Sequence, residues 1–260
     1  LKDDYAGRDI KSLPAAVDRL MKDIYARLRA IKPDVLIEFR QSYIGPAIRQ
    51  YGNMLRAGDC PGDLLANRCR TANLRLTSGK TAVHADMLEW NVADTPENAA
   101  RFVLSAMFST IQYSVMLRTL PADHKRMVAH WLDFSRRPRH ALLKDWFRPH
   151  HYEANYPWIE AGDDTETVIG CYQQGTVLPV PSDGKAVYVL DGTGTGELVL
   201  DLAAPMSVRL TDTFGTPSGE AKLARGLQRV RRHGGRRAGH QRDQQKCTHR
   251  ISLLSFLTRG

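Results

Sequence analysis

The sequence predicts an α/β unit, built on a parallel sheet or barrel, followed by a second unit made of β-strands. Up to about residue 150, strand-like and helix-like apolar patterns alternate along the chain. After Trp146 the pattern changes to short β-rich runs separated by turn signals such as Asp-Gly and Gly-Thr-Gly. The length of 260 residues and the apolar content of 42% suit a packed globular core.

The first helix is expected over residues 12–32. Ser12 is a suitable N-cap, and Pro33 ends the helix. Apolar side chains recur every three or four residues and form one stripe on the helix surface. This stripe consists of Leu13, Val17, Leu20, Ile24, Leu28 and Ile31.

The other elements follow at short intervals. In the α/β part, strands are expected at 35–39, 53–57 and 81–84, helices at 64–73, from Asp94 onward and at 122–143, and a strand or helix at 105–114. In the β-rich part, strands are expected within 166–180, 185–191, 197–202 and 207–214.

The positive charge is concentrated near the end of the chain. The net charge is +9, but residues 222–260 hold 11 Lys and Arg against one acid, which leaves 26 basic and 27 acidic residues elsewhere. From about Val230 the sequence loses its apolar period, which predicts a disordered tail or a reading-frame error, and both alternatives stay open. The tail lacks interleaved aromatic residues, so no nucleic-acid partner is expected.

The sequence shows no sign of a membrane span, a disulfide framework, a cofactor motif or a metal site. No apolar run reaches eighteen residues, so no membrane partner is expected. The cysteines lack CxxC spacing and are interpreted as reduced thiols, which favours a cytoplasmic location. No phosphate-loop motif and no metal-ligand spacing occurs, so neither a cofactor nor a metal is expected. The four cysteines are Cys60, Cys69, Cys171 and Cys247.

Two carboxylates stand at predicted strand ends, Asp4 and Asp59. Active sites of parallel barrels form at the carboxyl ends of strands, so both residues are candidates for acid/base or nucleophilic chemistry. The alternative is that Asp59 and Asp63 cap the following helix while Asp4 lies in a solvated loop.

Four segments around these positions carry a resemblance to a known family. Lys2-Asp3-Asp4 resembles the Lys-x-Asp signature of melibiase-type α-galactosidases, glycoside hydrolase family 36 and its clan relatives. Arg56-Ala57-Gly58-Asp59 resembles their sixth-strand segment, in which an Arg shortly precedes the acid/base Asp. Residues 37–41 and 82–87 resemble the fifth and seventh strands. Asp3 departs from the family, which usually has an apolar or aromatic residue there.

The resemblance covers residues 1 to 225 and implies a fold. It makes residues 1–150 the C-terminal part of a (β/α)8 TIM barrel, about strands four to eight. Residues 151–225 would form a small all-β sandwich domain, followed by the basic tail at 226–260. Because the first strands of the barrel are not in this sequence, the chain by itself is expected to be inactive.

The resemblance also implies an activity, hydrolysis of terminal α-galactosides with retention. Asp4 would be the nucleophile and Asp59 the acid/base, and such a pair lies about 5 Å apart across the scissile bond. The residues expected to bind substrate are Lys2, Glu38, Arg40, Arg56, His84 and Trp90. A solvated Lys2, a structural ion pair of Arg40 with Glu38, and a structural His84 remain alternatives.

The expected partner is an α-galactoside oligosaccharide or glycoconjugate, and a homo-oligomer is left open. Two other functions also stay open. One is a related α-glycosidase or galactosyl transferase with a different substrate. The other is a non-catalytic remnant or carbohydrate-binding protein.

Overall fold

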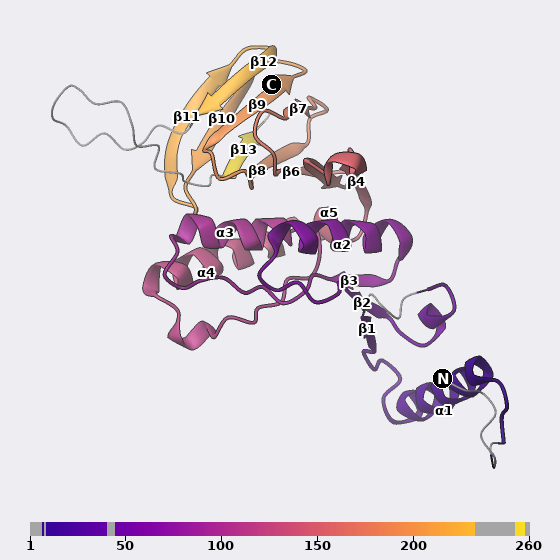
Figure 1. Cartoon of the computed structure of the whole chain (residues 1–260). Coiled ribbons are helices and arrows are strands. Elements are labelled where there is room, and N and C mark those ends of the chain that lie inside the picture. Colours follow the sequence, from indigo (N-terminus) through magenta and orange to yellow (C-terminus); the bar gives the residue numbers. More distant parts are fainter. Residues whose placement is uncertain (1–6, 8, 41–44, 232–252, 258–260) are drawn as a thin grey trace.

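The computed structural model describes residues 7, 9–40, 45–231 and 253–257. Figure 1 shows a β-rich half, a layer of helices beside it, and a small group of strands on the other side of these helices. The helices are α1 (Leu13–Ile31), α2 (Leu64–Thr77), α3 (Pro96–Ser105), α4 (Ala122–Arg136) and α5 (Arg139–Leu143), with short 3-10 turns η2 (Ile48–Gln50), η3 (Leu117–Thr119) and η4 (Tyr152–Ala154). The strands are β1 (Glu38–Arg40), β2 (Met54–Arg56), β3 (Ala82–His84), β4 (Trp146–His150), β5 (Trp158–Gly162), β6 (Glu166–Cys171), β7 (Val177–Val180), β8 (Ala186–Asp191), β9 (Glu197–Leu202), β10 (Met206–Thr211), β11 (Pro217–Leu223), β12 (Gly226–Arg231) and β13 (Leu253–Leu257).

The first half of the chain forms a small parallel sheet in the order β1-β2-β3. Each strand has three residues, and the register places Phe39 opposite Leu55 and Leu55 opposite Val83. Beyond β3, the expected strand or helix at 105–114 is reduced to isolated bridges, His84 to Thr110 and Leu88 to Tyr113.

The expectation of a TIM-barrel fold is wrong. Within the described ranges no sheet closes on itself, and most strand residues belong to two larger β-sheets in the second half of the chain. Closure of a barrel requires a full set of strands with matching tilt and stagger. The alternation of strand and helix patterns predicts parallel pairing, which is present, but it does not specify how many strands pair or whether they close.

The second half of the chain forms a seven-stranded sheet and a three-stranded sheet. The larger sheet has the order β11-β10-β13-β8-β6-β5-β4, and the smaller has the order β12-β9-β7. Pairing is antiparallel except between β6 and β8 in the larger sheet and between β7 and β9 in the smaller. The β-rich half therefore begins with β4 at Trp146, inside the residues that the resemblance assigns to the barrel.

Two hydrophobic cores lie on the two faces of the seven-stranded sheet. Because side chains alternate between the faces of a strand, neighbouring residues of β6 enter different cores. Val168 packs into the core shared with α3 and α4, which includes Trp131 and Phe134. Ile169 packs into the core shared with the three-stranded sheet, which includes Leu200. The large sheet is thus covered by helices on one face and by strands on the other.

Part of the basic tail is ordered into strands. β12 pairs with β9, and β13 lies between β8 and β10 within the seven-stranded sheet. Residues 226–231 and 253–257 are thus strands where a disordered tail was the expectation, while the alternative of a reading-frame error stays a prediction. The polar composition of the surrounding tail conceals these strands, because they form by pairing with strands that are distant in sequence.

The helices follow the local signals more closely. α1 spans Leu13–Ile31, which confirms the helix expected at 12–32. α2 begins after Asp63, whose side chain accepts a hydrogen bond from the backbone N–H of Ala66, so the capping alternative is confirmed for Asp63. None of the described helices has the length and apolar character needed to cross a bilayer.

Candidate functional site

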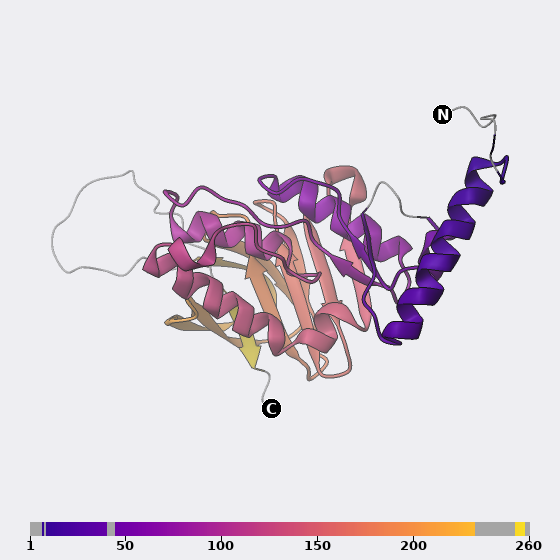
Figure 2. The same ribbon diagram turned by 90° about the horizontal axis from the view of Figure 1, so that it is seen from below.

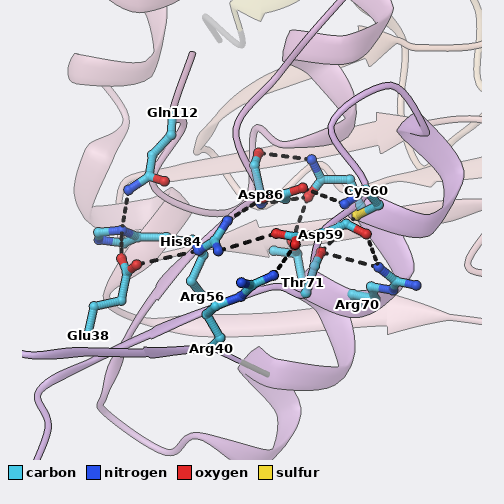
Figure 3. A network of polar contacts seen from close by, with 12 residues as sticks. Glu38, Arg40, Arg56, Asp59, Cys60, Arg70, Thr71, His84, Asp86 and Gln112 are labelled. Carbon is cyan, nitrogen blue, oxygen red and sulfur yellow. Dashed lines mark hydrogen bonds and ion pairs between the residues drawn. The ribbon is translucent and has the colours of Figure 1, made fainter. Parts of the chain in front are cut away.

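The candidate site lies at the edge where the strands of the small parallel sheet end. Arg40, Arg56 and His84 are the last residues of β1, β2 and β3, and they lie opposite one another in register. The carboxyl ends of parallel strands meet at one edge of a sheet, so side chains there can converge. Figure 3 shows these residues within a network of polar contacts that also includes Glu38, Asp59 and Asp86.

Arg56 is the centre of this network. The residue is 8% exposed, and its guanidinium faces three carboxylates. Nε lies 3.5 Å from Glu38 Oε1, Nη2 lies 3.4 Å from Asp59 Oδ1, and Nη1 donates to Asp86 Oδ1. A guanidinium with this many charged acceptors is held in one orientation. Arg56 therefore presents a fixed positive charge between the ends of the strands.

Asp86 holds Arg56 from the buried side of the network. The residue is 1% exposed, and its second oxygen accepts a hydrogen bond from the backbone N–H of Cys60. Its own backbone is bonded twice to the Asn67 side chain on α2, with both distances 3.0 Å. Asp86 thus ties together β3, α2 and the turn that carries Asp59.

Asp59 is the most accessible carboxylate of the network, with 66% of its side chain exposed. One oxygen is paired with Arg40 and the other with Arg56. The hydrogen bond from Arg40, followed by the charges of Arg40 and Arg56, holds the pKa of Asp59 below its ordinary value. In this arrangement Asp59 is ionised at neutral pH.

The backbone around Asp59 is held in place by Arg70 of α2. Arg70 Nη1 donates to the carbonyl of Gly58 at 3.2 Å and to the carbonyl of Asp59 at 2.8 Å. The neighbouring Cys60 is buried, and burial raises the pKa of its thiol. The turn is therefore rigid even though the carboxylate at its tip is in solvent.

Glu38 and His84 form a second pair at this edge. His84 Nδ1 lies 2.7 Å from Glu38 Oε2 and 2.8 Å from Gln112 Nε2. Nδ1 donates to Glu38 only when it carries the proton, and it accepts from the Gln112 amide only when it does not, so the two contacts belong to different tautomers of the imidazole. Both side chains are largely buried, 28% exposed for Glu38 and 13% for His84.

The structure brings together five of the eight predicted site residues, namely Glu38, Arg40, Arg56, Asp59 and His84. The alternative ion pair of Arg40 with Glu38 does not form among the described residues, since Arg40 pairs with Asp59 and Glu38 with Arg56 and His84. Lys2 and Asp4 lie outside the described residues.

Trp90 does not form an exposed wall of the site. It is 5% exposed and belongs to the core, where its ring packs near those of Phe102 and Tyr113. Its indole N–H donates to His124 Nδ1 at 3.0 Å. The pairing of the indole with a residue 34 positions away explains why the local sequence did not indicate burial.

Several residues of the network were not among the predicted site residues, including Asn67, Arg70 and Gln112. Asn67 and Arg70 lie on α2, and their helical positions suggest only a solvated or capping role. Their contacts are made across 11 to 19 residues of sequence, and no local signal could have indicated them. Across the described ranges, no group of three or more His, Cys, Asp or Glu side chains is arranged to hold a metal ion.

Comparison with known proteins leaves the family open. No family model matches this sequence. No curated protein matches it either. Among solved structures, N2152 from Neocallimastix frontalis is similar over 93% of this chain, with 9% identity and a TM-score of 0.38. The chain spans 65% of the length of that structure. A likeness at this level gives no indication of function.

Proposed function

We propose that this chain carries the acid/base part of a retaining glycosidase site for terminal α-galactosides, with Asp59 as the acid/base residue and Asp4 as the nucleophile. The observation that carries the proposal is the position of the Asp59 carboxylate. It is exposed on a rigid turn at the carboxyl ends of three parallel strands, between two arginines. The resemblance of residues 56–59 to the acid/base segment of the melibiase-type family supports the same assignment.

The surrounding groups suit the recognition of sugar hydroxyls. Glu38 offers acceptors, Arg56 offers donors, and His84 can do either through its second nitrogen. Their mutual contacts fix these side chains before a ligand arrives, which reduces the entropy lost on binding. When a sugar lacks a hydroxyl at the expected position, the protein group that would bind it is left unpaired. This cost gives selectivity between epimers.

Proton donation by Asp59 requires a change at Arg40. While Arg40 is paired with Asp59, the carboxyl is ionised and cannot protonate a leaving oxygen. The Arg40 side chain is 47% exposed, so a sugar that enters the site can displace it or recruit it as a hydroxyl donor. Loss of the Arg40 hydrogen bond and exclusion of water by the bound sugar would both raise the pKa of Asp59, the direction that an acid catalyst requires.

A non-catalytic carbohydrate-binding role is the second candidate. It is favoured by one observation, the low pKa of Asp59 in the present arrangement, because an acceptor of sugar hydroxyls functions best when it is ionised. In this case Arg40 would stay paired with Asp59 in the complex and no bond of the sugar would break.

The chain was expected to be inactive because it held only part of a barrel, and the open sheets of the structure remove that reason. Ligand binding and hydrolysis can therefore both be measured on the 260-residue protein. Binding of methyl α-galactoside to the 260-residue chain is followed by saturation-transfer NMR, with methyl α-glucoside as the epimer control. We expect Asp59→Asn and Arg56→Gln to weaken galactoside binding. The matched control is Asp63→Asn, four residues further on, where Asn preserves the helix cap.

The outcomes separate the two candidates. Selective binding together with release of nitrophenol from an aryl α-galactoside, lost in Asp59→Asn and kept in Asp63→Asn, supports the glycosidase. Selective binding that is lost in Asp59→Asn, without hydrolysis in any form of the protein, supports the binding role. Absence of galactoside binding, or equal binding by all variants, contradicts both.

A further inference from the structure

A second polar region lies at the opposite end of the small sheet. A pocket of about 670 Å³ is lined by the turn after α2, the start of β3, both ends of α5 and the start of β4. Figure 1 shows α2, α5 and β4 together where the helix layer meets the β-rich half. The Asp59 carboxylate follows the other end of the strands and does not line this pocket.

The lining of this pocket is strongly cationic. It includes Arg75, Lys80, Arg139 and Lys144, and a single acid, Asp145. No carboxylate among the described residues forms an ion pair with any of these four cations. Uncompensated cations around a concave surface raise the local concentration of anions.

Arg75 is the half-buried member of this set, and the other three cations are exposed. Its Nη1 donates to the carbonyls of Phe108 and Leu142, at 2.8 and 2.7 Å, and its guanidinium lies 3.9 Å from the ring centroid of Phe147. Burial lowers its pKa to about 10, so it remains a cation at neutral pH. The Arg75 guanidinium therefore has carbonyl and aromatic neighbours but no counterion. An anion that enters the pocket would stabilise its charge.

Arg49 adds a cation at the rim. Its Nε donates to Thr81 Oγ1 at 3.3 Å, and Thr81 lines the pocket. Its guanidinium lies over Gly79, where an added Cβ would be 2.8 Å from Nη2. Gly79 has φ of +59°, so the turn after α2 favours glycine for its backbone conformation and also for the closeness of Arg49.

We propose that this pocket binds a small anionic ligand that carries a phosphoryl or sulfuryl group, held by Lys80, Arg139 and Lys144. The oxygens of such a group accept charge-assisted hydrogen bonds from Lys and Arg. The half-buried ring of Trp146 forms one wall and suits an apolar part of the ligand next to the anion. The site is independent of the galactoside proposal.

A simpler role for two of these cations is to neutralise helix ends. Lys80 and Lys144 follow the C-termini of α2 and α5, where positive charge is favourable. In that role they would stabilise the helices whether or not an anion is present. The two roles differ in whether replacement of the lysines changes anion binding.

The test measures binding of inorganic pyrophosphate, inorganic phosphate and sulfate to the full chain by isothermal titration calorimetry in low-salt buffer. We expect saturable binding that weakens as sodium chloride is added. Lys80→Glu and Lys144→Glu should each weaken it at least about tenfold, because each replaces an attractive charge by a repulsive one. The matched control is Lys11→Glu, which makes the same change of net charge at an exposed position outside the pocket.

Circular dichroism and the melting temperature of each variant check the fold, and the neutral pair Lys80→Gln and Lys144→Gln serves if a charge reversal unfolds the protein. Stronger binding of phosphate than sulfate points to a phosphoryl ligand, and the reverse points to a sulfuryl ligand. Tighter binding of phenyl phosphate than of inorganic phosphate supports the Trp146 wall. No saturable binding of any of these anions, or equal loss in Lys11→Glu, overturns the proposal. Lower melting temperatures with unchanged anion binding would mean that the lysines serve only the helix ends.

Discussion

The guanidinium of Arg56 and the carboxylate of Asp86 form an ion pair that is almost withdrawn from solvent, with 10% and 2% of the two side chains exposed. The pair joins the end of β2 to Asp86, two residues beyond the end of β3, and Asp86 in turn holds the backbone of Cys60. The charge that faces the open edge of the sheet is therefore fixed from its buried side.

Replacement of Asp86 should destabilise the protein. Asp86→Ala removes one of the carboxylates paired with the buried Arg56 and the acceptor of the Cys60 N–H. We therefore expect the free energy of unfolding to fall by about 2–4 kcal/mol. Urea denaturation followed by circular dichroism measures it. Asp133→Ala is the control, since its ion pair with Arg137 is exposed and should contribute less than about 1 kcal/mol. Equal effects of the two substitutions would show that the buried pair is not important for stability.

If the glycosidase proposal holds, the loss of turnover in Asp59→Asn should depend on the leaving group of the substrate. In Asp59→Asn, natural galactosides with basic leaving oxygens should lose most of their turnover, whereas dinitrophenyl α-galactoside needs little protonation and should lose less. Added azide should restore turnover and give α-galactosyl azide, identified by proton NMR. In Asp4→Asn any azide product should be the β-anomer. The reverse pattern would mean that the two roles are exchanged.

Asp191 should make stability depend on pH. The residue is fully buried, one of its oxygens has no hydrogen-bond partner, and burial raises its pKa from 3.8 to about 6. Between these two values the folded state binds more protons than the unfolded state, so this residue lowers the free energy of unfolding as pH rises from about 4 to 6. Asp191→Asn keeps an acceptor for the Thr193 N–H and hydroxyl and cannot ionise.

We therefore expect Asp191→Asn to be more stable than the parent protein at pH 7.5, by up to about 3 kcal/mol, and similar to it at pH 4. Denaturant midpoints at the two pH values give the difference. A variant that is less stable than the parent at pH 7.5 would indicate that Asp191 gains more from nearby Arg101 than it loses by burial.

β13 should be essential to the seven-stranded sheet. Its Ser255 lies opposite Tyr188 of β8 and Arg209 of β10, so the strand is paired on both sides. Ser255→Pro removes a backbone donor from this central strand and should lower stability by about 3 kcal/mol or more. Ser255→Ala retains the donor and is the control. Thermal unfolding with no difference between the two variants would show that the pairing does not contribute.

Local features of the fold were predictable where local forces decide them. The extent of α1 follows from its apolar period, and the start of α2 follows from Asp63 as its cap. Strand β3 at Ala82–His84 lies within the expected residues 81–84. The arrangement of these strands into an open sheet, and the place of β13 between β8 and β10, depend on pairs far apart in sequence.

The candidate site shows the same division. Arg56 and His84 end β2 and β3 as the resemblance and the strand pattern predicted, and Glu38 begins β1, two residues before Arg40 and on the same side of the strand. Asn67 and Gln112 were missed because they come from other elements and act through contacts that only the folded chain creates. Trp90 was assigned to the site because an exposed and a buried indole look alike in sequence.

Helix α1 has no buried residue, and Figure 2 shows it at the edge of the molecule. Two of its side chains contact Tyr51. Asp18 accepts a hydrogen bond from the Tyr51 hydroxyl, and the ring of Tyr25 packs edge to face against the Tyr51 ring. Because so few contacts hold α1 against the rest of the protein, we expect this helix to unfold locally while the sheets stay folded. Its amide hydrogens should exchange with deuterium far faster than those of α3, whose inner face is buried, and protease cleavage should begin near residue 32 before the sheets unfold.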